Sequence, residues 1–417
     1  MCRPVRFLIA ILFSIGAQAA SALQVLPLLL PITGNVAQPS ITAAPGGGFI
    51  LTWQQRESAT TSLHFATLDS DGVLQRQGRI AQSEPTQTWF VNWADFPALV
   101  VLDNGDWVTY WLQKRSKGTY AYDIYLTRST DAGRTWSDAI IPHRDATASE
   151  HGFVSLVPAG DDRVLAIWLD GRNTAGAGHD HAASGGAMTL RSATINRSGK
   201  ITAESEIDAR TCDCCSTDAA RIGAETLLIY RDRSGEEIRD MAFSRRNRAG
   251  RWSAPAIVHA DRWKISGCPV NGPALAVNDG RALAVWTTMQ GEDLSVRAAL
   301  GNARGFADMV ELDHGSGTLG RVDAAPWGIS AFLVSWVAQG PVADDHRIES
   351  PKTEVTRIHL DVIDRRAKIS ERAILATLPK ASNPGMPRIA ASGRIAIAVW
   401  TQSIERNTTI HAALIRH

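Results

Sequence analysis

Neither sign of charge dominates this 417-residue sequence, in which 43 Lys and Arg residues stand against 42 Asp and Glu residues. That balance excludes a polybasic nucleic-acid-binding protein, and a hydrophobic content of 44% excludes a disordered chain. After residue 22, no stretch approaches the roughly 20 consecutive apolar residues that a transmembrane helix needs. Tyrosine is scarce, at five residues, whereas 13 tryptophans and 34 glycines favour short strands joined by tight turns.

The N-terminal segment, positions 1–22, predicts a secretory signal peptide. Arg3 and Arg6 precede the apolar run 7–15, and small residues follow that suit cleavage after Ala19 or Ala22. We therefore expect one mature domain, residues 23–417, that is periplasmic or secreted and has no transmembrane segment after cleavage. Its four cysteines would then lie in an oxidising compartment. The oligomeric state is left open by the sequence.

A strand–turn–strand unit recurs seven times along the mature chain. Each unit has an apolar strand, a turn that contains glycine, and a second apolar strand that ends in an aromatic residue. A third strand with alternating apolar residues follows each unit. Strand repeats with a period of roughly 60 residues predict the blades of an all-β propeller. The closing aromatics are Trp53, Trp111, Trp168, Tyr230, Trp286, Trp336 and Trp400.

We expect seven four-stranded blades, with six as the alternative if one copy is irregular. Fourth strands follow the first six units, for example at 138–142 and 255–259, but the chain ends inside the seventh unit. Residues 23–30 are expected to supply the missing strand. Such a closure joins the first and last blades and removes two exposed sheet edges.

The segment 129–136 reads S-T-D-A-G-R-T-W and resembles the Asp-box, S-x-D-x-G-x-T-W, of sialidase-like propellers. We expect a turn in which Asp131 accepts backbone hydrogen bonds, Gly133 has a positive φ, and Trp136 packs between strands. With this motif and its repeats, the mature chain resembles bacterial secreted sialidase-like propellers (BNR or Asp-box repeat proteins). The resemblance implies a propeller fold and an exo-acting, exo-α-sialidase-like glycoside hydrolase. Residues 23–60 contain no counterpart of the Phe-Arg-Ile-Pro type motif that sialidases carry in the first blade.

Propeller topology sorts the connections onto two faces. The turns between strands one and two and between strands three and four are short and lie on one face. The opposite face, called the loop face below, carries every cysteine of the mature chain and the densest groups of His, Arg and carboxylate residues. Because loops on a rigid scaffold concentrate function, we expect a glycan or another small ligand to bind there, off-centre over blades three to five. The longer loops are 83–96, 143–152, 169–187, 208–218, 231–239 and 260–271.

The cysteines of the loop face are Cys212, Cys214 and Cys215 before the fourth unit and Cys268 before the fifth. Their spacing is not that of a zinc ribbon. In an exported protein we favour disulfides, with at least one joining the triplet to Cys268. The alternative is a copper or zinc site. Its further ligands would be the histidines of the same face, His151, His179 and His181.

The same loops carry acids and arginines suited to the cleavage of an acidic sugar. Such cleavage needs a proton donor, a nucleophile or base, and guanidinium groups for the sugar carboxylate. By residue type, sialidase-like roles would make Asp170 the acid/base and Tyr230 the nucleophile, assisted by Glu236 or Glu237. For each residue the alternative is an ion-pair network that braces the rim. The substrate contacts would be Arg172, Arg231, Arg233, Arg239, Arg321 and Trp263.

Two classes of function follow from these observations. One is a secreted, sialidase-like, glycan-active hydrolase. The other is a non-catalytic periplasmic propeller that binds a ligand, a partner or a metal ion through its Cys- and His-bearing loops. The sequence predicts no nucleic-acid partner for either class.

Overall fold

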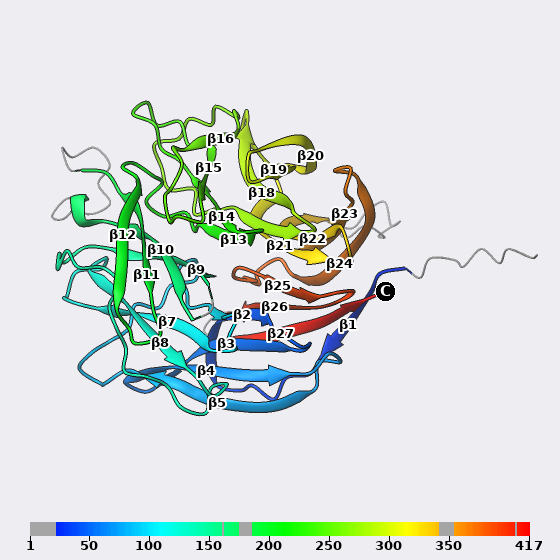
Figure 1. Ribbon diagram of the computed structural model, residues 1–417. Helices are drawn as coiled ribbons and strands as arrows, with labels where there is room; N and C mark the ends of the chain where they lie inside the picture. The colour runs from blue at the N-terminus through cyan, green and yellow to red at the C-terminus, as the bar shows by residue number, and fades with distance from the viewer. Residues whose placement is uncertain (1–21, 161, 175–185, 342–353, 405–406) are drawn as a thin grey trace, which may run out of the picture.

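The computed structural model describes residues 22–160, 162–174, 186–341, 354–404 and 407–417. They form seven antiparallel sheets that follow one another around a ring, so the predicted seven-bladed β-propeller is confirmed (Figure 1). The described part contains one 3-10 helix, η1 (Arg172–Thr174). No helix in these ranges has the length and apolar character needed to cross a membrane. The predicted signal peptide lies almost entirely outside the described residues, as do His179 and His181.

The first four blades take up the N-terminal two thirds of the chain. Blade 1 is β2 (Asn35–Ala43), β3 (Phe49–Glu57), β4 (Thr60–Leu68) and β5 (Leu74–Gln82). Blade 2 is β6 (Leu99–Val101), β7 (Trp107–Lys114) and β8 (Tyr122–Ser129). Blade 3 is β9 (His151–Pro158), β10 (Val164–Asp170), β11 (Thr189–Ile195) and β12 (Ile201–Asp208). Blade 4 is β13 (Asp218–Ile222), β14 (Glu225–Arg231), β15 (Met241–Arg246) and β16 (Ala256–His259).

The last three blades include the strand that closes the ring. Blade 5 is β17 (Ala274–Asn278), β18 (Arg281–Gln290), β19 (Asp293–Asn302) and β20 (Gly305–Gly315). Blade 6 is β21 (Thr318–Trp327), β22 (Ala331–Pro341), β23 (Glu354–Ile363) and β24 (Ile369–Pro379). Blade 7 is β25 (Arg388–Ser392), β26 (Ile395–Ile404), β27 (Asn407–Arg416) and β1 (Gln24–Leu28).

Blade 7 is completed from the opposite end of the chain, as the sequence predicts. Strand β1 pairs antiparallel with β27, from Gln24 opposite Arg416 to Leu28 opposite Ala412. In blade 2, by contrast, the strand expected at 138–142 is reduced to a single β-bridge between Leu126 and Ile140. The segment that follows β8 is largely irregular as far as Arg144, so that edge of the blade pairs only locally.

The hydrophobic core is divided among the contacts between neighbouring blades. Buried apolar residues form seven clusters in the described chain, and each cluster joins two adjacent sheets. Strand β10 shows the cause, because all its residues are buried and successive side chains point to opposite faces. Ala166 and Trp168 pack toward blade 2, whereas Leu165 and Ile167 pack toward blade 4. A blade of this kind loses a core face if either neighbour is absent.

Polar side chains link the innermost strands of successive blades. At three blade boundaries, an aspartate of one blade accepts a hydrogen bond from a backbone N–H group of the next blade. Asp95 Oδ1 accepts from Phe153 at 2.8 Å, Asp218 Oδ2 from Leu275 at 2.7 Å, and Asp323 Oδ2 from Ile389 at 2.6 Å. Buried N–H groups need such partners, so these carboxylates fix blade 2 to blade 3, blade 4 to blade 5, and blade 6 to blade 7.

The segment 129–136 forms the expected turn. Asp131 accepts hydrogen bonds from the Thr135 backbone N–H at 2.9 Å and the Thr135 hydroxyl at 2.7 Å. Gly133 has a φ of 83° and its N–H donates to Ser129 Oγ. The Trp136 ring packs near Phe65 and Trp107. The motif therefore attaches blade 2 to blade 1, away from the loop face.

Deletion of residues 23–30 should expose the free edge of β27 and lower both the solubility and the melting temperature of the mature protein. Removal of β1 deletes the strand that pairs with Ala412–Arg416 and leaves unpaired backbone groups on an edge. Light scattering and thermal unfolding of the two forms check this expectation. A truncated chain as soluble and stable as the full mature chain would contradict the closure.

Candidate functional site

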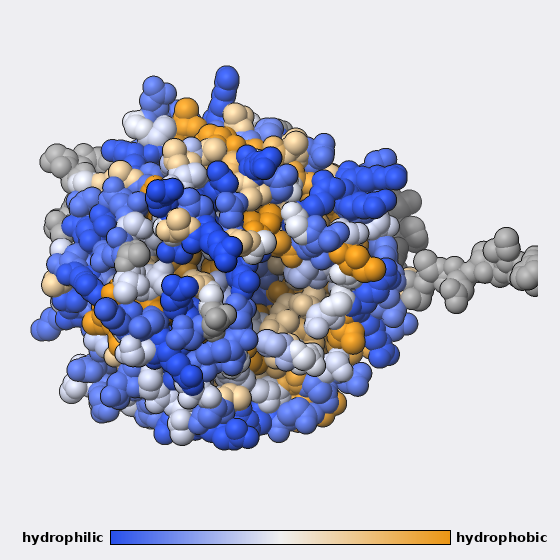
Figure 2. All heavy atoms as spheres, in the orientation of Figure 1, coloured by the Kyte–Doolittle hydropathy of each residue, from blue (hydrophilic) through white to orange (hydrophobic). Residues whose placement is uncertain are grey.

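A cavity opens on the loop face where the seven inner strands converge. Figure 2 shows a surface that is mainly hydrophilic and is hollowed near the centre of the ring seen in Figure 1. Every blade supplies a residue from its inner strand or the approach to that strand. These residues are Ser40, Ala98, Val154, Thr217, Gly272, Val322 and Arg388. The site is therefore axial, whereas the expected position was off-centre.

Asp95 is the buried acid of this central cavity. Its side chain lines the cavity although only 2% of the residue is exposed. Burial raises the pKa of Asp95 to about 7, although hydrogen bonds from the Phe153 N–H and the Tyr122 hydroxyl act in the opposite direction. Asp95 is thus suited to exchange a proton near neutral pH.

The Tyr122 hydroxyl lies between two carboxyl groups. Its oxygen is 3.0 Å from Asp95 Oδ2 and 2.7 Å from Glu150 Oε1. A phenol has one proton to donate, so both contacts are hydrogen bonds only when one of the carboxyl groups is protonated. This arrangement favours a proton retained beside the cavity.

Arg321 is the cation at the mouth of the cavity. Its guanidinium lies 4.9 Å from the Trp93 ring and donates hydrogen bonds to Asn383 Oδ1 at 2.6 Å and the Gly385 carbonyl at 3.1 Å. Burial lowers the pKa of Arg321. Its backbone has a φ of 55°, the left-handed region that non-glycine residues rarely adopt. Trp93 is 40% exposed and lines a neighbouring cavity that shares Phe96 with the central one.

Arg388 is the second cation of the cavity, and it is paired. Its Nη1 lies 3.3 Å from Asp323 Oδ1, and its side chain is 33% exposed. Burial lowers the pKa of Arg388, but Asp323 and Asp218 more than offset this and hold it above the usual range. Arg321 donates to an amide and a carbonyl oxygen instead of a carboxylate, so it is the better contact for an added anion.

Asp170 and Arg172 are joined to each other at the end of β10. Asp170 has no exposed surface and accepts bonds from Arg172 Nε and Nη2, each at 2.7 Å, and from Trp168 Nε1 at 2.7 Å. Burial acts to raise the pKa of Asp170, but Arg172 holds it below the usual range. Neither residue lines the central cavity.

Tyr230 and the glutamates expected to assist it make separate contacts. The Tyr230 hydroxyl donates to Asp208 Oδ2 at 2.7 Å, and Tyr230 is 1% exposed. Glu237 accepts hydrogen bonds from Arg233 and Arg239, whereas Glu236 is exposed at the tip of the same loop.

Three of the expected substrate-binding arginines lie inside the protein, namely Arg231, Arg233 and Arg239. Arg231 is 1% exposed and donates to the carbonyl groups of Asn271, Arg239 and Thr287. Its guanidinium lies 4.7 Å from the Trp263 ring. Arg239 has no exposed surface. Among the substrate contacts predicted from the sequence, Arg321 is the one that lines the central cavity.

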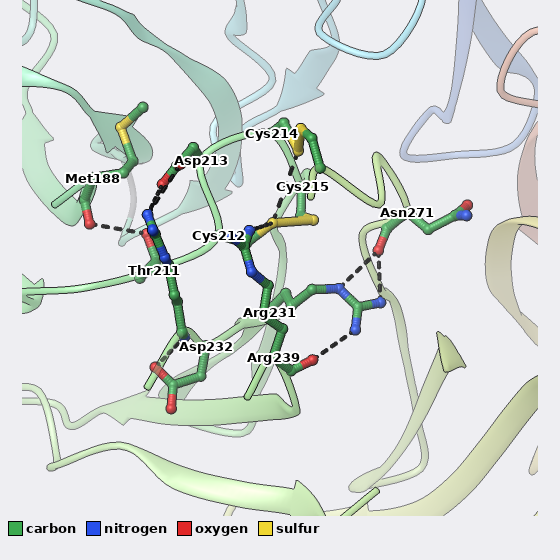
Figure 3. The surroundings of a disulfide bond; sticks show 12 residues. Met188, Thr211, Cys212, Asp213, Cys214, Cys215, Arg231, Asp232, Arg239 and Asn271 are labelled. Carbon is green, nitrogen blue, oxygen red and sulfur yellow. Dashed lines mark hydrogen bonds and ion pairs between the residues drawn. A yellow bond between two sulfur atoms is a disulfide. The ribbon is translucent and has the colours of Figure 1, made fainter. Parts of the chain in front are cut away.

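The four cysteines form two disulfides, Cys212–Cys215 and Cys214–Cys268. The second joins the two loops and confirms the predicted link to Cys268. Figure 3 shows the cysteines beside Asp213, Arg231 and Arg239, and Arg239 Nη1 lies 3.6 Å from Cys212 Sγ. His151, which was a possible further ligand of a metal at the cysteines, lies near other residues. Its ring is close to Asp123 and His143 on one side and to Asp145 and Asp170 on the other.

The sequence did not single out Asp95, Tyr122, Glu150 or Arg388. Asp95 lies in the loop 83–96, which was recognised, but no periodicity there distinguishes an axial side chain from a peripheral one. The one available signal was position. Each blade's inner strand begins on the loop face, so the polar residues at these beginnings are the ones closest to the axis.

Comparisons with known proteins bear on the fold. No family model matches the sequence, and no curated protein matches it. The chain is similar to a solved structure of a protein of unknown function from Dyadobacter fermentans, at 11% identity over 95% of this chain and 100% of that chain, with a TM-score of 0.53. Two others are an α-L-arabinanase from Penicillium chrysogenum (11% identity, 92% and 93% covered, TM-score 0.47) and a sialidase from Trypanosoma rangeli (11%, 84% and 57%, 0.48). At these identities the likeness concerns the propeller fold alone.

Asp95 should make the stability of the protein depend on pH. Its pKa is about 7 in the folded protein and near 3.9 in an unfolded chain, so folding retains a proton between these values. The free energy of unfolding should therefore fall as the pH rises from about 4 to about 7, by up to about 4 kcal/mol from this group. Urea unfolding at a series of pH values should show that the free energy of unfolding of Asp95→Asn depends less on pH than that of the wild type. Parallel profiles for the two proteins would contradict the assignment.

Proposed function

We propose that this protein is an exo-acting glycoside hydrolase of the sialidase-like kind, which takes the terminal acidic sugar of a glycan into the central cavity. The observation that carries the proposal is Asp95, a carboxyl group that lines the cavity and has a pKa near 7. A general acid works best when its pKa is close to the working pH. Asp95 would protonate the leaving oxygen of the glycosidic bond.

The mouth of the cavity supports an acidic sugar as substrate. Arg321 can offer charge-assisted hydrogen bonds to a sugar carboxylate, and the exposed face of Trp93 can pack against the apolar face of a pyranose ring. Asn383 and Gln38 line the neighbouring cavity, where amide groups suit sugar hydroxyls. A second sugar unit, or the aglycone, would extend in that direction.

Export to the periplasm or the cell exterior is part of this proposal. It is supported by the sequence pattern at positions 1–22 and by two disulfides, which persist in oxidising compartments. A glycan outside the cytoplasm would be the partner.

A non-catalytic, ligand-binding propeller is the second candidate. The pairing of Asp170 with Arg172, and the enclosure of Tyr230 and Arg231, favour a bracing role for much of the rim. In that case the same cavity binds an acidic ligand without cleaving it.

The test is hydrolysis of a panel of sialosides, uronides and neutral glycosides by the mature protein. Asp95→Asn should lower kcat by about 100-fold or more, because a general acid contributes roughly 10² to 10⁴ in rate. Asp361→Asn is the matched control, since Asp361 is also 2% exposed but lies on β23, outside the cavity. Full activity in Asp95→Asn together with loss of activity in Tyr230→Phe would show that the reaction takes place near Tyr230 and not in the central cavity. An inactive wild-type protein that still binds the acidic sugars through Arg321 would favour the second candidate.

Arg321→Gln should raise KM for acidic glycosides about tenfold or more and leave neutral glycosides little changed. The glutamine keeps a polar side chain but removes the positive charge that would contact a sugar carboxylate. Steady-state kinetics on a matched pair of acidic and neutral substrates measure the difference. Equal effects on both substrates would count against an acidic sugar.

A further inference from the structure

Two histidines of the loop face lie stacked between two aspartates, at the boundary of blades 2 and 3. The rings of His143 and His151 are 3.7 Å apart between centroids and nearly parallel, and both side chains are fully buried. Asp123, at the start of β8, faces one side of this pair. Asp145, from the loop that leads to β9, faces the other side.

The ring of His143 makes no hydrogen bond of good geometry in the described structure. Both Nδ1 and Nε2 lie beside carboxylate oxygens without being aligned with them, although His143 is only 3% exposed. Its nearest polar contacts are Asp145 Oδ1, 3.3 Å from Nδ1, and Asp123 Oδ1, 3.6 Å from Nε2. Asp123 Oδ1 is also buried without a hydrogen bond. A buried polar atom without a hydrogen bond is unfavourable, so Asp123 Oδ1 and the nearby His143 Nε2 favour a ligand between them.

The separations around Asp123 match those of ligands that share one metal ion. Asp123 Oδ1 lies 3.6 Å from His143 Nε2 and 3.7 Å from His151 Nδ1. Two ligand atoms at about 2.1 Å from a tetrahedral ion lie about 3.4 Å from each other, which is longer than a hydrogen bond. All three atoms lie within 4.8 Å of one another.

We infer that Asp123, His143 and His151 form a binding site for a divalent transition-metal ion of the Zn²⁺ class. Two imidazoles and one carboxylate make a donor set that suits this ion. Asp145 lies next to the opposite nitrogens of both rings, where a carboxylate orients metal-binding histidines. Asp123 is itself positioned by Arg115, whose Nε donates to Asp123 Oδ2 at 2.8 Å.

Binding requires a local rearrangement. The lone pairs of parallel rings do not converge, so the two histidines must turn toward Asp123. His151 Nδ1, which lies 3.2 Å from the Tyr122 carbonyl, must also exchange that contact for the ion. On the other side of His151, Arg172 already supplies a cation to Asp170 and Asp145. The ion is therefore assigned to the Asp123 side.

This inference is independent of the proposed hydrolase. None of the three ligands lines the central cavity, and the cysteine sulfur atoms are taken up by the two disulfides. The proposed ion is thus also distinct from the copper or zinc site at the cysteines that the sequence left open as the alternative to disulfides.

The experiment is a titration of the mature, disulfide-bonded protein with Zn²⁺ after treatment with a chelator, followed by calorimetry. We expect one ion per chain and a rise in melting temperature. His143→Phe, which retains an aromatic ring in the stack, should weaken binding at least tenfold. His359→Phe is the matched control, because His359 also stacks on an aromatic ring, that of Trp336, in another blade. It should bind like the wild type.

A second variant and a spectroscopic probe distinguish the loss of a metal ligand from misfolding of the variant. Asp123→Asn should also weaken Zn²⁺ binding, in a protein whose far-ultraviolet circular dichroism matches that of the wild type. Co²⁺ in place of Zn²⁺ should give visible bands without the intense near-ultraviolet absorption of a cobalt–thiolate bond. Absence of binding to the wild type, unchanged affinity in folded His143→Phe or Asp123→Asn, or a thiolate band would each overturn the inference.

Discussion

Aspartate carboxylates near the centre of the ring hold three pairs of neighbouring blades in register. Asp95, Asp218 and Asp323 each accept a backbone N–H from the following blade, far away in the sequence. Packing between blades supplies most of the stability, but apolar contacts are not directional. The hydrogen bonds of these aspartates fix the positions of the inner strands of blades 3, 5 and 7 relative to the preceding blades, and so help to determine which side chains meet at the axis.

The burial that comes with these hydrogen bonds also determines which group in the central cavity can exchange a proton. An aspartate that must accept a bond inside the ring is removed from water, and the pKa of Asp95 rises to about 7 as a result. Burial also raises the pKa of Asp323, but there the charge of Arg388 acts in the opposite direction. The side-chain partner of Asp95 is the Tyr122 hydroxyl, which carries no compensating positive charge, so Asp95 remains the group that can exchange a proton with a bound ligand. Structure and reactivity therefore come from one set of residues.

Much of the fold was accessible from the sequence because its signals are local. The strand–turn–strand units, the period-two alternation and the turn at 129–136 each involve residues close in the chain. The closing strand is predicted because the seventh unit has one strand fewer than the other units. The site was less accessible because it depends on long-range contacts. Arg231 and Arg321 look alike in the sequence, yet one binds backbone carbonyls in the interior and the other lies at the cavity mouth. His143 lies in a loop that the sequence predicts, but its poorly aligned contacts with two carboxylates are a property of the packed structure.

Hydrogen–deuterium exchange at the amides of Phe153, Leu275 and Ile389 tests most directly whether the aspartates hold the ring together. If these bonds fix the inner strands, the three amides should exchange as slowly as the slowest amides of the central strands, through global unfolding alone. Asp323→Ala should then speed exchange at Ile389 before it affects strands on the far side of the ring. Exchange of the three amides at the rate of exposed loops in the wild-type protein would contradict this role for the buried carboxylates.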